Sequence, residues 1–226
     1  MLYLIPTKKG IGVEIWGTYE DLDFLYDFID RFWTVDGDYK NIPGEESRNI
    51  VISSFSYEIR KAKQGARLVR SESHLHPIKN QYLGCQITWV HLLFTLSCIK
   101  FNMQFDEVDK LERSHMLLLE YWIEESMKEY DPVGAKDLVL FTQNVLYGGN
   151  PYIYHYMRSI DIDYLLLGGG KRAFRKLAGL LEKGIVFTSE YEAFEKFLVR
   201  EAKRLKCDIS NLEINDEEVD YEYLQW

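Results

Sequence analysis

The stretch TWVHLLFTLSCIKF, residues 88–101, decides how the chain divides between sheet and helix. From residue 89 onward, apolar side chains occupy nearly every side of the expected helix, which predicts a central helix covered by its neighbours. Short strand-like segments precede this stretch, and long helical segments follow it. The sequence therefore predicts an α+β fold, in which a small N-terminal antiparallel sheet with covering helices is followed by a mainly helical C-terminal half.

The first segments of the chain predict a β-hairpin followed by a helix. Residues 2–5 and 11–16 are apolar, and the turn-forming residues 7–10 join them. Thr18 and Asp21 have the spacing of a helix-capping box, and apolar residues follow at helical spacing. A hairpin and an amphipathic helix are therefore expected within the first 33 residues.

Short apolar segments continue up to residue 87 and favour antiparallel pairing, because closely spaced strands leave no room for crossover helices. The segment 55–64 favours a helix, and a strand is the alternative there. The predicted elements are strands at 49–53, 67–72 and 82–87, and a helix at 55–64 that Ser54 caps and Gly65 ends.

The second half of the chain carries helical periodicity and clear start signals. The predicted helices are 108–130, one that begins at Asp131-Pro132 and ends at Gly148-Gly149, 171–183, and 190–206 behind a Ser189-x-x-Glu192 capping box. We expect a single domain over residues 1–207, sheet-rich over 1–87 and helical over 88–207, with an acidic aromatic tail over 208–226.

The composition indicates a globular cytoplasmic protein. Of the 226 residues, 46% are hydrophobic and 28% charged, which excludes a disordered chain. The lysines near the start follow the first apolar run, the wrong order for a secretory signal, and no apolar run reaches the length of a membrane span. The three cysteines, Cys85, Cys98 and Cys207, form no C-x-x-C pair. A reducing cytoplasm without a membrane partner is therefore expected.

Charge is distributed unevenly along the chain, whose net charge is −9. Residues 171–206 hold ten basic and five acidic residues, whereas 208–226 hold seven acidic residues and no Lys or Arg. An acidic segment with aromatic side chains suits docking onto a partner, because charge steers and rings anchor. The alternatives are a solubilising disordered end and a lid over residues 171–206. The predicted partner-binding residues are Tyr221, Tyr223, Leu224 and Trp226.

A glycine-rich segment, LLLGGGKRAFRK at 165–176, is the candidate anion site. Its spacing fits neither a Walker A loop nor the G-x-G-x-x-G fingerprint. Three glycines before a helix can still expose backbone N–H groups, which attract anions together with the helix dipole. The alternative is a connector that turns a corner before an ordinary solvated helix face. The predicted anion-binding residues are Gly168, Gly169, Gly170, Lys171, Arg172, Arg175 and Lys176.

A second basic run extends over residues 60–70 and could contact nucleic acid if it adjoins the first. The negative net charge makes nucleic acid a possible but unfavoured partner. The residues of this run are Arg60, Lys61, Lys63, Arg67 and Arg70.

Other candidate chemistry in the sequence is weak. His74-x-His76 could place two imidazoles on one face, but no third ligand follows at a useful spacing, so no metal and no cofactor are expected. His91 and His115 lie among apolar residues, as hydrogen-bonded core histidines do. No G-x-S-x-G and no cysteine signature indicates nucleophilic catalysis. A carboxylate pair at Glu120 and Glu124 shares one helical face, as solvated surface pairs often do.

Three segments resemble an uncharacterised family of bacterial cytoplasmic proteins. They are IGVEIWGTYEDL at 11–22, YEIRKA at 57–62 and EYDP at 129–132. The resemblance covers most of the first 150 residues and implies a bacterial cytoplasmic setting. It implies no activity, ligand or catalytic residue.

These observations favour a non-enzymatic bacterial binding or regulatory protein that acts through a protein partner, such as an accessory or immunity protein in conflict or phage defence. An enzyme acting on a phosphorylated or nucleic-acid substrate through the glycine-rich segment is the alternative. A homo-oligomeric scaffold is the second alternative.

Overall fold

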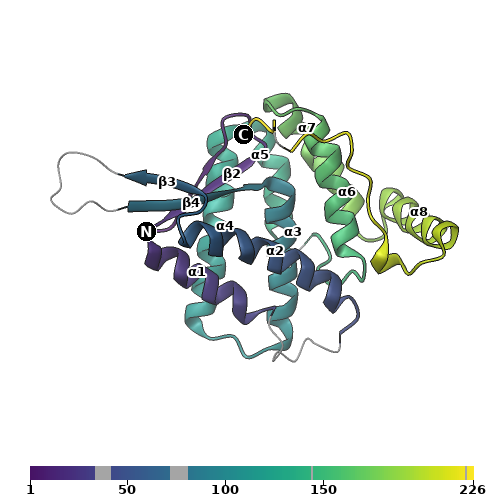
Figure 1. Cartoon of the computed structure of the whole chain (residues 1–226), viewed down its shortest axis with the longest axis horizontal. Helices are drawn as coiled ribbons and strands as arrows, with labels where there is room; N and C mark the ends of the chain where they lie inside the picture. The colour runs from purple at the N-terminus through teal and green to yellow at the C-terminus, as the bar shows by residue number, and fades with distance from the viewer. Residues whose placement is uncertain (34–41, 72–80, 144, 222) are drawn as a thin grey trace.

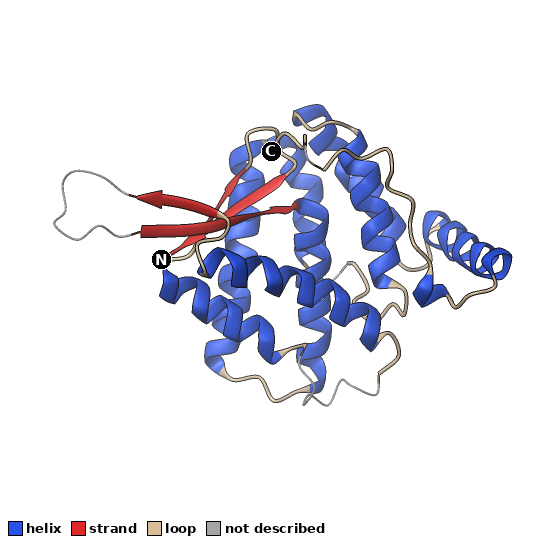
Figure 2. Ribbon diagram, viewed as in Figure 1, coloured by secondary structure: helices blue, strands red, loops and turns tan. Residues whose placement is uncertain are grey.

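The strands of the described residues form one antiparallel sheet on one side of the molecule, and helices make up most of the remainder (Figure 2). The computed structural model describes residues 1–33, 42–71, 81–143, 145–221 and 223–226. The sheet order is β1-β2-β4-β3. The predicted α+β class, the hairpin and the two later strands are confirmed. The strands are β1 (Tyr3–Pro6), β2 (Gly12–Gly17), β3 (Leu68–Ser71) and β4 (Gln81–Thr88).

Helix α1 (Tyr19–Arg31) follows the hairpin directly and confirms the predicted capping box. The Thr18 side chain accepts a hydrogen bond from the N–H of Asp21, and the Asp21 carboxylate accepts one from the N–H of Thr18 at 2.9 Å. These two bonds satisfy N–H groups that the first helical turn leaves without partners. The chain therefore turns from strand to helix within two residues.

The strand predicted at residues 49–53 is wrong, because these residues belong to helix α2 (Glu45–Lys63). The β-branched run there suggested a strand, but Val51, Phe55 and Ile59 continue at helical spacing and are fully buried. Ser54 is therefore not a cap: it lies inside the helix, and its hydroxyl donates to the Val51 carbonyl at 2.9 Å. The helix that was predicted from residue 55 begins ten residues earlier.

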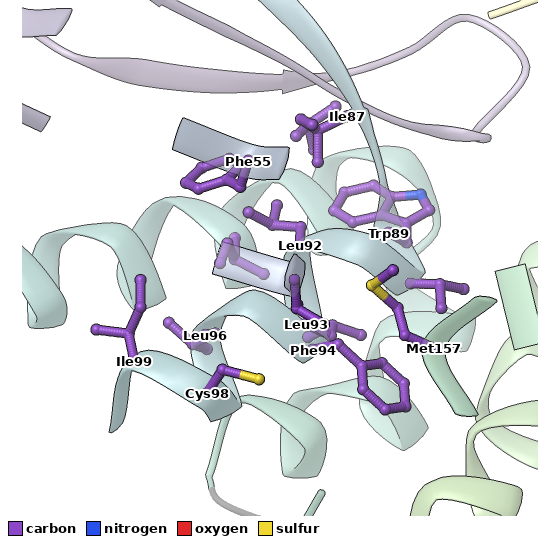
Figure 3. Packing of buried hydrophobic residues seen from close by; sticks show 14 of the residues in the cluster. Phe55, Ile87, Trp89, Leu92, Leu93, Phe94, Leu96, Cys98, Ile99 and Met157 are labelled. Carbon is purple, nitrogen blue, oxygen red and sulfur yellow. The ribbon is translucent and has the colours of Figure 1, made fainter. Parts of the chain in front are cut away.

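Helix α3 (Trp89–Asn102) is the central helix that the opening stretch predicts. Thr88 ends β4 and also caps α3, because its side chain accepts from the N–H of His91. Nearly every apolar residue of α3 is buried, in a core shared by strands and helices. Figure 3 shows Trp89, Leu92, Leu93, Phe94 and Leu96 of this helix among Phe55 of α2, Ile87 of β4 and Met157.

Helices α6 and α7 lie on the side of α3 away from the β3–β4 hairpin, α4 lies on the hairpin side, and α8 lies at the outer edge (Figure 1). The helix after Asp131 is shorter than predicted and gives way to a short 3-10 helix (Val139–Thr142) well before Gly148. Thr188, one residue before the predicted Ser189, caps the last helix. The helices are α4 (Lys110–Tyr130), α5 (Pro132–Leu138), α6 (Ile153–Leu166), α7 (Lys171–Leu181) and α8 (Ser189–Leu205).

Arg48 ties the ends of α1, α2 and α3 together while fully buried. Its Nε donates to Asn102 Oδ1 at 3.0 Å, and the Asn102 amide donates to the carbonyl of Phe32 at 2.7 Å. The guanidinium also donates to the Pro43 carbonyl and stacks on the Phe101 ring. Burial lowers the pKa of Arg48, and these acceptors compensate part of the cost of removing its charge from water.

The turn of the β1–β2 hairpin is inserted into the helical half through Gly10. The Gly10 carbonyl accepts hydrogen bonds from the indole of Trp89 at 3.1 Å and from the hydroxyl of Tyr164. Gly10 has a φ of +66°, and a Cβ there would lie 2.1 Å from the ring of Tyr130. Only glycine fits both this backbone conformation and this space.

A Gly10→Ala substitution is expected to lower the free energy of unfolding by roughly 3 kcal/mol, from left-handed strain together with overpacking. Gly168→Ala is the matched control, because Gly168 also has a positive φ but a Cβ there meets nothing within 4 Å. The control should lose only about 1 kcal/mol. Urea denaturation of both variants measures the difference, and equal losses would show that the contact with Tyr130 is unimportant.

Candidate functional site

The glycine-rich segment turns the corner between α6 and α7. Gly168, Gly169 and Gly170 all have positive φ values, 73°, 77° and 86°. The N–H of Gly170 donates to the carbonyl of Lys9 at 2.6 Å, and a Cβ on Gly169 would lie 2.7 Å from that oxygen. The three glycines therefore let two helices meet the hairpin turn closely, which is the connector role named as the alternative.

The four basic residues at the start of α7 differ in their contacts. Lys171, Arg172 and Lys176 are exposed and form no ion pair with a described residue. Arg175 binds Asp131 through two hydrogen bonds, Nε to Oδ2 at 2.6 Å and Nη2 to Oδ1 at 3.1 Å. A two-point contact of this kind is among the stronger ion pairs. Arg175 therefore joins α7 to the start of α5.

Asp131 has two structural roles. Its carboxylate accepts the hydrogen bonds of Arg175 and also caps α5 by accepting from the N–H of Gly134 at 3.3 Å. The hydrogen bonds from Arg175 lower the pKa of Asp131 to about 2, so its side chain is ionised at every pH near neutrality. The sequence located this cap but not its arginine partner.

A cavity of about 330 Å³ lies between the glycine corner and the tail. Gly168 and Leu165 line it on one side, and Glu218 and Asp220 line it on the other. Two carboxylates at this place disfavour an anionic ligand while the tail keeps this position. The predicted anion site therefore stays a prediction.

The acidic tail lies along α6 (Figure 1). The carbonyl of Leu212 accepts from Nε2 of buried His155 at 3.0 Å, and the Leu212 side chain is buried. Further along the tail, Arg158 of α6 donates to the carboxylate of Asp216 and to the hydroxyl of Tyr221. The lid alternative expected the tail to fold back onto residues 171–206. The tail does fold back onto its own chain, but these hydrogen bonds are with α6.

The predicted partner-binding side chains occupy the last part of this tail. Tyr221 is 46% exposed and Tyr223 is 77% exposed, whereas Leu224 and Trp226 are half-buried. Leu224 and Tyr223 border the cavity at the glycine corner. Two exposed rings at the end of a thinly packed segment can contact another molecule without unfolding the core.

A second, larger groove of about 440 Å³ runs between α6, α8 and the tail. Its lining is mainly apolar and includes several charged side chains. Phe194 and Phe197 stack on each other at 5.8 Å between ring centres along one wall. The apolar lining residues are Ile162, Phe194, Phe197, Leu205, Leu212 and Ile214, and Asp163, Glu201, Arg204 and Glu213 are the charged ones.

Arg158 lies beside a buried carboxylate of its own helix. Asp161 is 8% exposed, and its Oδ1 has no hydrogen-bond partner among the described residues. Burial raises the pKa of Asp161 to about 6, against the lowering effects of Thr88 and Arg158. Burial also opposes ionisation of Arg158, yet Tyr221 and Asp216 hold its pKa above the ordinary value. The tail therefore adds a second negative charge close to Arg158, which Asp161 also influences.

The second basic run makes contacts with other side chains. Arg67 binds Glu58 at 2.6 Å and Lys63 binds Asp23 at 2.6 Å. The guanidinium of Arg70 stacks on Trp16 and reaches the hydroxyl of Tyr3. These contacts reduce the charge that the run presents to a polyanion. Arg60 and Lys61 lie over the ring of Tyr57.

The remaining candidate groups have structural contacts where they are described. His74 and His76 lie outside the described residues. His91 is hydrogen-bonded to Ser54 at 2.9 Å, as predicted for a core histidine, and burial lowers its pKa. His115 packs its ring against Phe28. Within the described ranges, no group of three His, Cys, Asp or Glu side chains is placed to hold a metal ion.

The predicted carboxylate pair on α4 is divided between two partners. Glu120 binds the ammonium of Lys100 at 2.6 Å, and Glu124 accepts from the hydroxyl of Thr142 at 2.8 Å. Both contacts connect α4 to neighbouring elements. Each carboxylate of the pair therefore has a structural partner on another element.

Comparison with models of protein families identifies the family of this chain. A family model described as a domain of unknown function, DUF6904, matches residues 2–226. The chain belongs to the DUF6904 family. The match extends through the helical half and the tail, well beyond the 150 residues of the predicted resemblance. Comparison with curated proteins and with solved structures finds no match. None of the helices in the described part of the chain has the length and apolar character needed to cross a bilayer.

The residues that hold the tail were missed in the sequence. His155 and Arg158 lie on α6, a helix that was not predicted. A signal was present, because Asn150-Pro151 can start a helix and apolar residues follow at spacings of three and four. The contact of Arg158 with a residue 58 positions away has no local signature.

Replacing Arg175 by Gln should make the protein more sensitive to acid. The folded pKa of Asp131, about 2, is below its ordinary 3.8, so the ion pair stabilises the fold above that pH and is lost as pH falls through 2. Without Arg175, unfolding should begin at higher pH. Circular dichroism during acid titration measures this, with exposed Arg172→Gln as the control. Identical acid transitions would contradict the contact.

Replacing Asp161 by Asn should stabilise the protein near neutral pH. The folded pKa of Asp161, about 6, is above its ordinary 3.8, so the ionised carboxylate destabilises the fold above pH 6. The gain should reach at most about 3 kcal/mol at pH 7.5 and vanish near pH 4. Asp163→Asn, on the same helix, is the control: its half-buried carboxylate pairs with Lys183 at 2.7 Å, and losing this partly exposed ion pair should change stability by only about 0.5 kcal/mol. Denaturant unfolding at both pH values provides the comparison.

Proposed function

We propose that the protein is a non-enzymatic bacterial cytoplasmic binding protein that acts through a protein partner. The supporting observation is the open apolar groove between α6, α8 and the tail. The proposed contact surface comprises this groove and the tail side chains Tyr221, Tyr223, Leu224 and Trp226. An accessory or immunity protein in conflict or phage defence would be a particular case of this role.

Helix α8 supports the proposal because it is packed on few side chains. Of its residues only Leu198 and Ala202 are buried, whereas Phe197 is 38% exposed and Leu205 is 54% exposed in the groove wall. Contiguous apolar surface with a charged rim is the pattern of protein contact surfaces. A partner segment with one or two large apolar side chains would cover the wall that the chain itself leaves open.

Charged side chains of the groove lining would orient that segment. Arg204 lies on the α8 side of the groove, and exposed Glu213 lies on the tail side. Opposite charges across a groove favour one direction of a bound segment over the other. A partner that carries an acidic residue on one side of its apolar anchor and a basic residue on the other would match both.

The cysteines support the cytoplasmic part of the proposal. Cys85 and Cys98 are buried free thiols, and Cys207 is a half-buried one. Burial raises the pKa of Cys85 and Cys98 far above neutrality, so both stay protonated and unreactive. Free thiols of this kind suit a reducing compartment.

The test is affinity capture from an extract of the source organism with the wild-type chain and two variants. Phe197→Glu places a charge in the groove wall, and Val199→Glu places one on an α8 side chain that is 53% exposed and outside the groove. A protein captured by the wild type and by Val199→Glu, but lost with Phe197→Glu, is expected. The purified partner should then bind Phe197→Glu about tenfold or more weakly in calorimetry.

Thermal unfolding of both variants should show that they fold alike. The proposal fails if the two variants capture the same proteins as the wild type. It also fails if the wild type enriches nothing over a variant with both changes.

A further inference from the structure

The tail is held on α6 by few points of contact. Among its described residues only Leu212 is buried, close to the end of α8. Beyond Leu212, Arg158 supplies the polar contacts to α6, with Asp216 and with Tyr221. A segment with so little buried apolar surface can detach locally at small cost while the core stays folded.

Two cavities adjoin the tail, one before Asp216 and one between Asp216 and Tyr221. The groove of about 440 Å³ lies beside Leu212 and Ile214, and the cavity of about 330 Å³ lies beside residues 218–220. The tail therefore bridges a surface that it does not fill. A peptide bound to the surface of a receptor leaves such unfilled spaces, whereas an element of the protein core packs against its neighbours at full density.

The chemistry of Arg158 defines what this surface recognises. Its guanidinium donates to a carboxylate, donates to a phenol hydroxyl and lies 5.2 Å from the centre of the Tyr221 ring. Arginine combines these three modes because its donors lie in a plane that also stacks on aromatic rings. Buried Asp161, three residues later on the same helix, adds to the negative charge near Arg158. The site can therefore recognise an acidic residue and a tyrosine of the same segment.

We propose that the Arg158 face of α6 is a binding site for an acidic, tyrosine-containing peptide segment of a protein partner, and that the chain's own tail occupies it as an intramolecular ligand. This rests on the proposed function, because it names the segment that the partner offers. A tethered ligand competes at high effective concentration, so only a partner that also fills the neighbouring groove displaces it. Displacement frees Tyr221 and Tyr223 for contact with that partner.

The test uses full-length chains and a defined probe. The double variant Asp216→Asn/Tyr221→Phe should loosen the tail while Leu212 keeps its anchor. The probe is a fluorescein-labelled synthetic peptide of residues 213–226, titrated by fluorescence anisotropy. The double variant should bind the probe about tenfold more tightly than the wild type, since a charge-assisted hydrogen bond of the competing tail has been removed.

Arg158→Lys, added to the double variant, should reverse this gain by about tenfold, because lysine keeps the charge but loses the planar guanidinium that lies over the Tyr221 ring. Arg113→Lys in the same background is the control and should leave binding unchanged, because Arg113 is exposed on α4 and lines neither cavity beside the tail. A probe that carries the same two changes as the double variant should bind as weakly as the Arg158→Lys chain binds the natural probe. Thermal unfolding checks that all chains are folded.

Two outcomes would overturn the inference. The first is equal affinity of the wild type and the double variant for the probe, or an affinity that the added Arg158→Lys substitution does not change. The second is dimerisation of the double variant in light scattering, which would make a second copy's tail the occupant. Either result leaves the capture experiment with Phe197→Glu unaffected, so the proposed function can survive the loss of this inference.

Discussion

The carbonyl oxygen of Gly10 is the acceptor on which the arrangement of the two halves depends. The hairpin turn brings this oxygen to the indole of Trp89 and the hydroxyl of Tyr164, so sheet, central helix and α6 share one buried polar contact. Both donors and the carbonyl oxygen are therefore hydrogen-bonded at this contact, and buried polar groups are costly to leave without a partner. The carbonyl of the preceding residue, Lys9, accepts a hydrogen bond from the N–H of Gly170, and this bond fixes the position of the corner between α6 and α7.

This constraint explains why the basic start of α7 does not act as an isolated patch. Once α7 is placed against the hairpin, Arg175 reaches Asp131 at the start of α5. The side chain that helical periodicity assigned to solvent becomes half of an interhelical ion pair. Arg67 and Lys63 in the second basic run likewise find carboxylates on neighbouring elements. Local charge counts therefore overstate the free charge of a folded surface.

Packing becomes thinner with distance from α3. Trp89 and Leu92 are fully enclosed, α8 buries two of its side chains, and the described tail buries one. Segments at the weakly packed end are the ones that can move or exchange partners, because less apolar surface must be exposed. The groove, the exposed rings of the tail and the Arg158 contact all lie at this end. Recognition is therefore proposed where the fold can tolerate change.

The sequence by itself determined the α+β class, the hairpin, the Thr18 cap, the central helix from residue 89 and the helix that follows the glycine corner. These follow from periodicity, capping and turn chemistry, which act over a few residues. Residues 49–53 were misassigned because β-branched side chains favour a strand locally, whereas burial against α3 selects a helix. The partners of Arg175, Arg158 and Gly10 were decided only by the tertiary structure, since each is distant along the chain and is chosen by how the elements pack.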